Sequence, residues 1–532
     1  MGAGARLNHS CPMTSYPRRA LLLGLSATAV AATLTGFAPP APAAPAGAPA
    51  PLAWRPCARP GGPAGQECAD LAVPVDYRHP DGPQLTVAVS RLRSDRPAAR
   101  RGTLLLIPGG PGGSGVQRLA QKGEALRKAT GGAYDLVGLD PRGVGGSTTA
   151  GCGLAPADRY LVSLRSWPSP DGAITDNVAR ARRVADACHR HGGAVLRSIS
   201  TASEVRDIDR FRQALGERKL SAWGVSYGTY VGAVYAQKYP QHTGRWVLDS
   251  SGDPDPARVE RGWLANMSAA ADDRFPDFAA WAADPARDKD GLRLAARPED
   301  VRPLFLALAA KLDRAPKEST TASVPLTGNM LRQALQNALY SDAFFAPLAR
   351  LVQQAQDPAA RPELPADLAG PLPDTDATAI MATLCNDVRW PASVPAHRRA
   401  VAADRARHPL TAGMPANITP CSFWKDAPDP RPTRITGDGP SNILMLQNLR
   451  DPSTPYFGAL KMRQALGDRA RLVTLDHGGH GAYLANGTAC GDRTVTTFLT
   501  TGRRPAHDVR CADPAAAPQA AGTGLRENSP GR

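Results

Sequence analysis

The stretch Lys219–Gln237, KLSAWGVSYGTYVGAVYAQ, places one serine, Ser226, in a glycine frame between two segments of different character. Residues 220–225 form a short apolar run typical of a buried strand, and the residues after Ser226 have helical spacing. G-x-S-x-G between a strand and a helix is the context of a nucleophile elbow, a sharp turn that exposes a serine hydroxyl above a sheet edge. The alternative is a glycine turn that happens to contain a serine.

The segments around this motif alternate between strand and helix patterns. Strand-like runs occur in DLAVPVDYRHP, QLTVAVSRLRS, GTLLLIPGG and AYDLVGLD, and RWVLDSS follows the Ser226 helix. Thr201 to Glu204 has the spacing of a capping box, and an apolar face with helical period follows it. Strands that alternate with helices predict an α/β fold with a mostly parallel sheet covered on both faces.

The chain divides into parts of different composition. The predicted sheet core comprises residues 54–252 and 436–512, and the segment 253–435 between them has helical patterns, proline-rich joins and few convincing strands. We interpret that segment as a helical lid insertion. A Pro/Ala linker over 44–53 precedes the core, and the tail 513–532 has a composition typical of disorder.

The N-terminal residues 1–43 have a basic start, an apolar centre and small residues suited to cleavage near Ala43, which predicts a cleavable signal peptide. Arg18 and Arg19 hint at twin-arginine export. A membrane anchor is the alternative, but Ala, Thr and Gly dilute the apolar run and prolines end it. No other run of about 18 apolar residues occurs, so we predict a secreted protein, either free or wall-associated, without stable membrane insertion.

The cysteine count fits an oxidising compartment. Of nine cysteines, Cys11 lies in the predicted signal peptide and eight remain. Pairing of sequence neighbours is our hypothesis, although eight cysteines allow many other connectivities. The proposed pairs are Cys57–Cys68, Cys152–Cys188, Cys385–Cys421 and Cys490–Cys511.

Charge and residue clustering argue against several classes of partner. The formal net charge is +15, but the arginines are scattered among alanines and acids, and no basic run is interleaved with aromatic residues. We therefore predict a solvated basic surface and no nucleic-acid partner. No C-x-x-C occurs and the histidines do not cluster with cysteines, so no metal or other cofactor is predicted.

A serine hydroxyl is a weak nucleophile until a base takes its proton, and the elbow motif predicts the order serine, acid, histidine. Asp451 comes just after the apolar strand NILMLQ, and His480 lies in a glycine loop after the next strand. We predict a triad of Ser226, Asp451 and His480. His477 is the alternative base, and Asp476 and Asp249 are the alternative acids.

Acyl transfer also needs donors for an oxyanion. One should be the backbone N–H of Tyr227, directly after the nucleophile, and the other should come from a loop after an earlier strand. The loop PGGPGGSG is suited to this role, and Gly110 is the candidate. No lysine follows in Walker fashion, which excludes a phosphate loop.

These motifs give the chain a family resemblance. PGGPGGSG, DLVGLDPRGVGGST, GVSYGTYVGAVYAQKYP, LRDPSTPY and GGHGAY resemble the secreted bacterial tripeptidyl aminopeptidases, serine peptidases of the α/β-hydrolase fold related to prolyl aminopeptidases. The likeness covers residues 54–511. Pro108 stands where the prolyl branch usually has histidine, and it fits the tripeptidyl branch better.

The resemblance implies a secreted exopeptidase that releases short peptides, expected to be tripeptides, from the free N-termini of peptides and proteins. Such an enzyme must bind an ammonium group, for which Asp387 is the candidate. A secreted carboxylesterase or amide hydrolase with the same triad is one alternative, and a non-catalytic binding protein is another. The sequence leaves the residue preference and the oligomeric state open.

Overall fold

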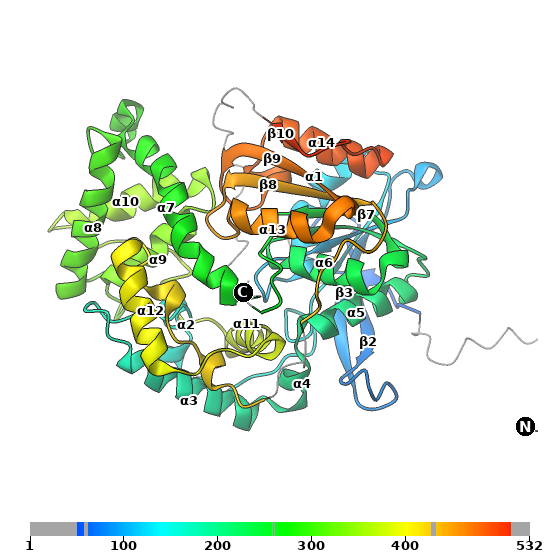
Figure 1. Cartoon of the computed structure of the whole chain (residues 1–532), viewed down its shortest axis with the longest axis horizontal. Coiled ribbons are helices and arrows are strands. Elements are labelled where there is room, and N and C mark those ends of the chain that lie inside the picture. The colour runs from blue at the N-terminus through cyan, green and yellow to red at the C-terminus, as the bar shows by residue number, and fades with distance from the viewer. Residues whose placement is uncertain (1–50, 58–61, 258, 260, 427–431, 512–532) are drawn as a thin grey trace, which may run out of the picture. The chain divides into compact units, whose positions relative to one another are not determined.

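The computed structural model describes residues 51–57, 62–257, 259, 261–426 and 432–511 (Figure 1). The predicted signal peptide, the linker up to residue 50 and the tail 513–532 lie outside the described residues. In the described part of the chain, no helix is both long enough and apolar enough to cross a lipid bilayer.

The described strands form one ten-stranded sheet in the order β1-β2-β3-β5-β4-β6-β7-β8-β9-β10. Pairs from β1 to β5 along this order are antiparallel, and every pair from β5 to β10 is parallel. This is the α/β-hydrolase arrangement, which confirms the predicted fold. The strands are β1 Arg55–Pro56, β2 Glu67–Pro74, β3 Gln84–Leu92, β4 Thr103–Ile107, β5 Asp135–Leu139, β6 Leu220–Val225, β7 Thr243–Asp249, β8 Ile443–Arg450, β9 Ala470–Gly478 and β10 Val509–Cys511.

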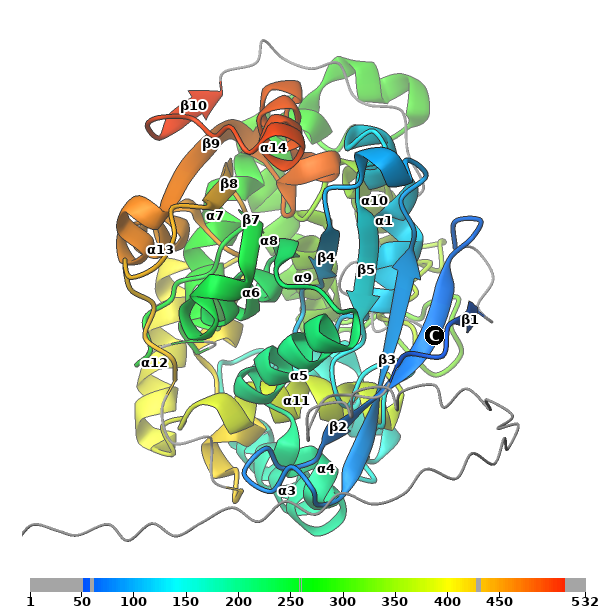
Figure 2. The same cartoon turned by 90° about the vertical axis from the view of Figure 1, so that its right-hand side faces the viewer.

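Helices cover both faces of the sheet (Figures 1 and 2). The helices are α1 Gly115–Ala129, α2 Leu161–Leu164, α3 Thr175–His191, α4 Gly193–Ser198, α5 Thr201–Ala214, α6 Tyr227–Lys238, α7 Arg261–Ala283, α8 Pro298–Arg314, α9 Gly328–Ala338, α10 Phe345–Gln356, α11 Asp374–Asp387, α12 Val394–Arg407, α13 Tyr456–Leu466 and α14 Ala489–Thr501. Apolar side chains of α5, α6 and α13 share one buried cluster with the sheet, and those of α1 and α14 share a second.

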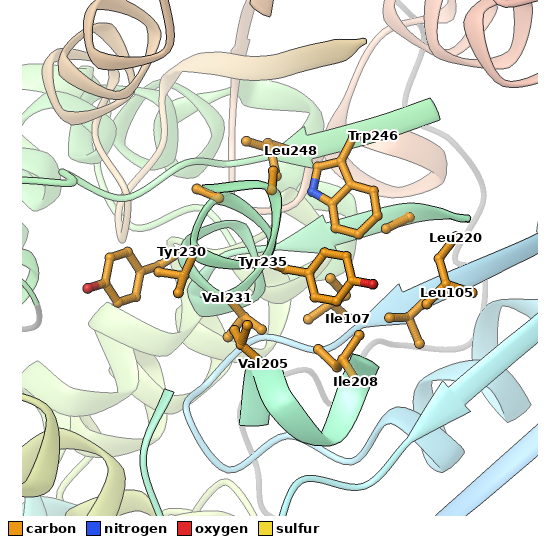
Figure 3. Close-up of a cluster of buried hydrophobic side chains, with 14 of the residues drawn as sticks. Leu105, Ile107, Val205, Ile208, Leu220, Tyr230, Val231, Tyr235, Trp246 and Leu248 are labelled. Carbon is orange, nitrogen blue, oxygen red and sulfur yellow. The ribbon is translucent and has the colours of Figure 1, made fainter. Parts of the chain in front are cut away.

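The two clusters explain why the central strands read as continuous apolar runs. Successive side chains of a strand point to opposite faces, so a strand covered on both faces needs apolar residues at every position. In β4, Leu105 and Ile107 face one cluster, whereas Leu104 and Leu106 face the other. Figure 3 shows the first cluster, where side chains of α5 and α6 meet those of β4, β6 and β7.

The helices α7–α12 lie between β7 and β8, and they have an apolar core of their own that is built largely from α7–α10. The helical lid insertion over 253–435 stays a prediction, and α2–α4 lie within the predicted sheet core 54–252. Residues 150–199 share a buried cluster with α11, because the apolar sides of α3 and α4 pack there. We use "helical region" for α2–α4 together with α7–α12.

Disulfides tie local segments together in both regions. All four predicted pairs are present: Cys57–Cys68, Cys152–Cys188, Cys385–Cys421 and Cys490–Cys511. Closing such loops restricts the unfolded chain and thereby stabilises the folded one.

The start of α5 differs from the prediction. Its N-cap is Ser200, whose hydroxyl accepts a hydrogen bond from Ser203 N–H, and not Thr201. The predicted capping box is therefore wrong. The Glu204 carboxylate accepts a hydrogen bond from the Tyr227 hydroxyl at 3.0 Å, so this side chain serves a contact between helices.

Candidate active site

Ser226 lies between β6 and α6 in a backbone conformation that non-glycine residues rarely adopt, with φ 58° and ψ −125°. The flanking glycines make this turn possible. A Cβ on Gly224 would lie 2.4 Å from the Gly228 carbonyl oxygen, and one on Gly228 would lie 2.6 Å from the carbonyl oxygens of Ile107 and Pro108. The first turn of α6 thus packs directly on neighbouring backbone, which fixes the position of the serine.

Asp451 and His480 follow β8 and β9, at the same carboxyl edge of the sheet as Ser226. The His480 Nδ1 atom lies 2.9 Å from both carboxylate oxygens of Asp451. Asp451 in turn accepts hydrogen bonds from the backbone N–H groups of Ser453 and Thr454 at 2.9 and 2.8 Å. This carboxylate fixes the imidazole with Nε2 as the nitrogen available for proton transfer.

The alternative base and the alternative acids have other partners. The His477 Nδ1 atom lies 2.7 Å from the Gly478 carbonyl oxygen, and Asp476 pairs with Arg450 and Arg510 at the surface. Asp249 is fully buried and accepts hydrogen bonds from the N–H groups of Ala482 and Tyr483 at 2.8 and 2.9 Å. Burial raises the pKa of Asp249 to about 6, and its hydrogen bonds oppose that rise. Asp249 therefore anchors the loop that carries His480.

The loop between β4 and α1 lies against Ser226. A Cβ on Gly109 would lie 2.9 Å from Ser226 Cβ, so only glycine permits this approach. Gly110 follows with φ 117°, a conformation that favours glycine. Asp140, at the end of β5, accepts hydrogen bonds from Ser114 Oγ at 2.5 Å and Val116 N–H at 3.0 Å. These bonds hold the loop over the sheet edge.

A cavity of about 400 Å³ joins these parts, within the usual range for small-molecule sites. Ser226, His480, Tyr227 and Gly110 all line it. Tyr227 is the first residue of α6, so its backbone N–H belongs to the first turn of that helix. The cavity wall opposite the sheet comes from the helical region, including α2 and α11.

Comparison with known proteins agrees with this geometry. The family model for TAP-like proteins matches residues 408–511. The tripeptidyl aminopeptidase of Streptomyces lividans is 32% identical over 461 residues, which cover 84% of this chain and 83% of that protein. The chain belongs to the tripeptidyl aminopeptidase family.

Two further relatives have different names. Serine protease Hip1 of Mycobacterium tuberculosis is 28% identical, and the match covers 87% of this chain and 91% of that protein. Carboxylesterase B of Mycobacterium tuberculosis is 30% identical, and the match covers 84% of this chain and 86% of that protein. All three relatives align over most of their length, so the match includes the helical region of this tripeptidyl aminopeptidase homologue as well as its sheet.

The structure places Asp387 behind the cavity wall of this family member. Asp387 is nearly buried at the end of α11, and it accepts hydrogen bonds from the N–H and the hydroxyl of Thr201. The Thr201 hydroxyl also lies 2.8 Å from the Tyr227 hydroxyl. Asp387 thus supports the start of α5 and, through Thr201, the side chain of Tyr227. The carboxylate that lines the cavity is that of Asp376, about three turns before Asp387 in α11.

Sequence analysis did not identify Tyr340, which follows α9. Its backbone carbonyl accepts a hydrogen bond from the backbone N–H of His480 at 2.9 Å. Its ring stands edge-on to the imidazole, with centroids 5.0 Å apart. Nearby, Asp277 of α7 pairs with Arg450 at the end of β8 at 2.8 Å. The helical region therefore holds part of the loop that carries His480, and no local motif around Tyr340 indicates this.

Proposed function

We propose that this protein is a secreted serine exopeptidase that releases short peptides, expected to be tripeptides, from free N-termini through an acyl-enzyme on Ser226. One observation supports the proposal above all. Ser226 has a strained backbone conformation and lines the same cavity as His480, whose imidazole is hydrogen-bonded to Asp451. A protein that only binds needs neither feature. The named activity of the Streptomyces lividans relative supports the substrate class.

The chemistry follows from the arrangement. His480 Nε2 takes the proton of Ser226 Oγ as that oxygen attacks the scissile carbonyl carbon, and Asp451 stabilises the imidazolium that forms. The N–H groups of Tyr227 and Gly110 receive the oxyanion of the tetrahedral intermediate. The imidazolium then gives its proton to the leaving amine, and the C–N bond breaks to leave an ester on Ser226. Water, deprotonated by His480, attacks that ester, and the proton returns to Ser226 as the short peptide leaves.

Asp376 is the group we assign to the substrate ammonium, in place of Asp387. It lines the cavity and is half-buried, and no lysine, arginine or histidine in the described part of the chain pairs with it. Burial raises its pKa, and a hydrogen bond from Thr375 opposes that rise. An ammonium ion that enters the cavity supplies the missing countercharge and stabilises the ionised form.

Paired substrates test this assignment. A free-amine tripeptide chromogenic amide and its N-acetylated form differ only in the charge at the N-terminus. We expect the enzyme to prefer the free amine, and Asp376→Asn to reduce that preference at least tenfold with little change on the acetylated form. Glu363→Gln, an exposed acid outside the cavity, is the matched control. Equal turnover of both substrates by the unaltered enzyme refutes the aminopeptidase proposal.

An esterase is the second candidate, because one relative is named carboxylesterase. The triad geometry serves esters and amides alike, so substrates with one acyl part separate the two functions. A kcat/KM that strongly favours a simple acyl ester over a tripeptidyl amide, with no release of tripeptides from a longer peptide, selects the esterase.

Secretion is also part of the proposal. The disulfides fit an oxidising compartment, and the predicted signal peptide over residues 1–43 supplies the route. N-terminal sequencing of the protein recovered from culture medium tests it. We expect a start near Ala44, and protein retained in the cytoplasm with Met1 intact contradicts it.

A further inference from the structure

The cavity wall carries three charged side chains besides His480: Arg118, Arg165 and Asp376. Arg118 is nearly buried and lies over the indole ring of Trp223, 4.6 Å from its centroid, so it is part of the packing under the wall. Arg165 is different. Its guanidinium makes no hydrogen bond or ion pair with any residue that the structure describes, although it is half-buried. A guanidinium on a cavity wall without a protein partner is available to an anionic ligand.

The backbone under Arg165 is held in place. Arg165 caps the C-terminus of α2, and Ser166 follows with φ 52°, an unfavourable conformation for a residue with a side chain. Buried Asn417 donates a hydrogen bond to the Ser166 carbonyl at 2.6 Å, and the Trp167 indole N–H donates to Gln333 at 2.8 Å. These hydrogen bonds hold the turn, so the backbone that carries the Arg165 side chain is fixed in place.

Arg165 lies toward the side of the cavity that receives the leaving group. The imidazole must reach the departing amine, so the residues around His480 mark that side. Tyr340 packs on the imidazole, and Trp167, two residues after Arg165, donates a hydrogen bond to Gln333 of α9, the helix that precedes Tyr340. The charge of Arg165 also acts on this tyrosine: burial raises the pKa of the Tyr340 hydroxyl, and Arg165 opposes the rise. Asp376 lies on α11, and Ile380, one turn further along this helix, lies against the glycine loop at Gly112.

We propose that Arg165 forms a carboxylate-binding subsite for the part of the substrate that follows the scissile bond. This subsite proposal rests on the proposed peptidase function and adds a specificity for the leaving group to it. The carboxylate has two possible sources, which are the free C-terminus of a short peptide and an acidic side chain directly after the scissile bond. With Asp376 and Arg165 both on its wall, the cavity offers one group to an ammonium and one to a carboxylate, which suits a short zwitterionic peptide better than a long neutral one.

Four substrates with one free-amine tripeptidyl part test the subsite. Their fourth residues are alanine with a free carboxylate, alanine amide, aspartate amide and asparagine amide. For each, kcat/KM is measured at fixed ionic strength with the unaltered protein, Arg165→Gln and the control Arg399→Gln, an exposed arginine of α12 outside the cavity. We expect the carboxylate to be preferred at least tenfold over its neutral counterpart in one or both pairs. Arg165→Gln should bring that ratio close to one and leave the neutral substrates within about threefold.

The outcomes separate the two proposals. A preference only in the alanine pair identifies the C-terminal carboxylate, and a preference only in the acidic pair identifies the side chain. Turnover of neutral and charged substrates at equal rates, or a preference that survives Arg165→Gln, refutes the subsite while the peptidase stands. No release of the tripeptide from any of the four substrates instead refutes the peptidase proposal. A loss on all four substrates in Arg165→Gln also refutes the subsite, because it indicates a structural role.

Discussion

The sheet and the helical region contribute to the cavity in different ways. The sheet supplies Ser226, Asp451 and His480 from loops at the carboxyl ends of parallel strands, where backbone contacts leave little freedom. The helical region supplies Asp376 and Arg165, charged groups without charged protein partners among the described residues. The first set suits bond cleavage, which is common to many substrates, and the second suits the choice among them. Changes to the sheet side should therefore lower turnover of every substrate, and changes to the helical side should alter ratios between substrates.

The largest effect should come from Ser226→Ala. Removal of the nucleophile should lower kcat by roughly 10⁶-fold on every substrate, while the far-ultraviolet circular dichroism and the melting temperature stay close to those of the unaltered protein. A fluorophosphonate probe should label the unaltered protein and not the variant. Labelling at another residue with activity retained contradicts the assignment of the nucleophile.

Gly228→Ala should have the next largest effect. The added methyl would lie 2.6 Å from two backbone carbonyl oxygens, so the first turn of α6 must move away from β4. We expect a loss of about 1–3 kcal/mol in stability and a fall in kcat on all substrates, because Ser226 moves with the turn. Gly370→Ala, where nothing lies within 4 Å of the added Cβ, is the control and should change neither. An active, fully stable Gly228→Ala variant contradicts the fixed seat of Ser226.

Paired removal of disulfide cysteines sharpens the contrast between the regions. Cys385–Cys421 ends α11, the helix that carries Asp376, whereas Cys490–Cys511 joins α14 to β10 in the core. Each double alanine variant should lose about 2–4 kcal/mol of stability by thermal unfolding. Only the Cys385/Cys421 variant should raise KM for the free-amine substrate relative to the acetylated one. The same change in both variants would mean that α11 does not set this selectivity.

The smallest effect concerns pH. Burial raises the pKa of Glu204 to about 8, with a further rise from Asp207 and Asp387, against the Tyr227 hydrogen bond and Arg142. Because its pKa is higher in the folded protein, the stability contributed by Glu204 is fully present below about pH 4.5 and declines as the pH rises toward 8.

Glu204→Gln cannot ionise and keeps an oxygen for the Tyr227 hydroxyl. We therefore expect the melting temperature of the variant to gain on that of the unaltered protein by a few degrees between pH 5 and pH 8. Other titrating groups, Asp249 among them, are the same in both proteins and cancel in the comparison. If the difference between the two melting temperatures is constant from pH 5 to pH 8, the pKa of Glu204 is not raised.

The prediction of the triad depends on signals that are local in the sequence. A glycine frame, a strand end and the order of serine, acid and histidine identified Ser226, Asp451 and His480, and the strand pattern predicted the fold. The structure joins His480 to Asp451 and seats Ser226 and His480 on one cavity, while their catalytic roles remain proposals. Tyr340, Arg165 and Asp376 have no such signal, since only the packing of the helical region brings them to the cavity. Asp387 was chosen for its charge and place in the insertion, but its carboxylate is used by Thr201.

The hydrogen bond from the backbone N–H of His480 to the backbone carbonyl of Tyr340 limits how the helical region can move away from the sheet. If the end of α9 moved away from the sheet, the Tyr340 carbonyl would leave the backbone N–H of His480, and the loop that carries His480 would lose this constraint. We therefore expect substrate to enter along another part of the cavity rim, because opening at this point would disturb His480 and interrupt turnover until the helix returned.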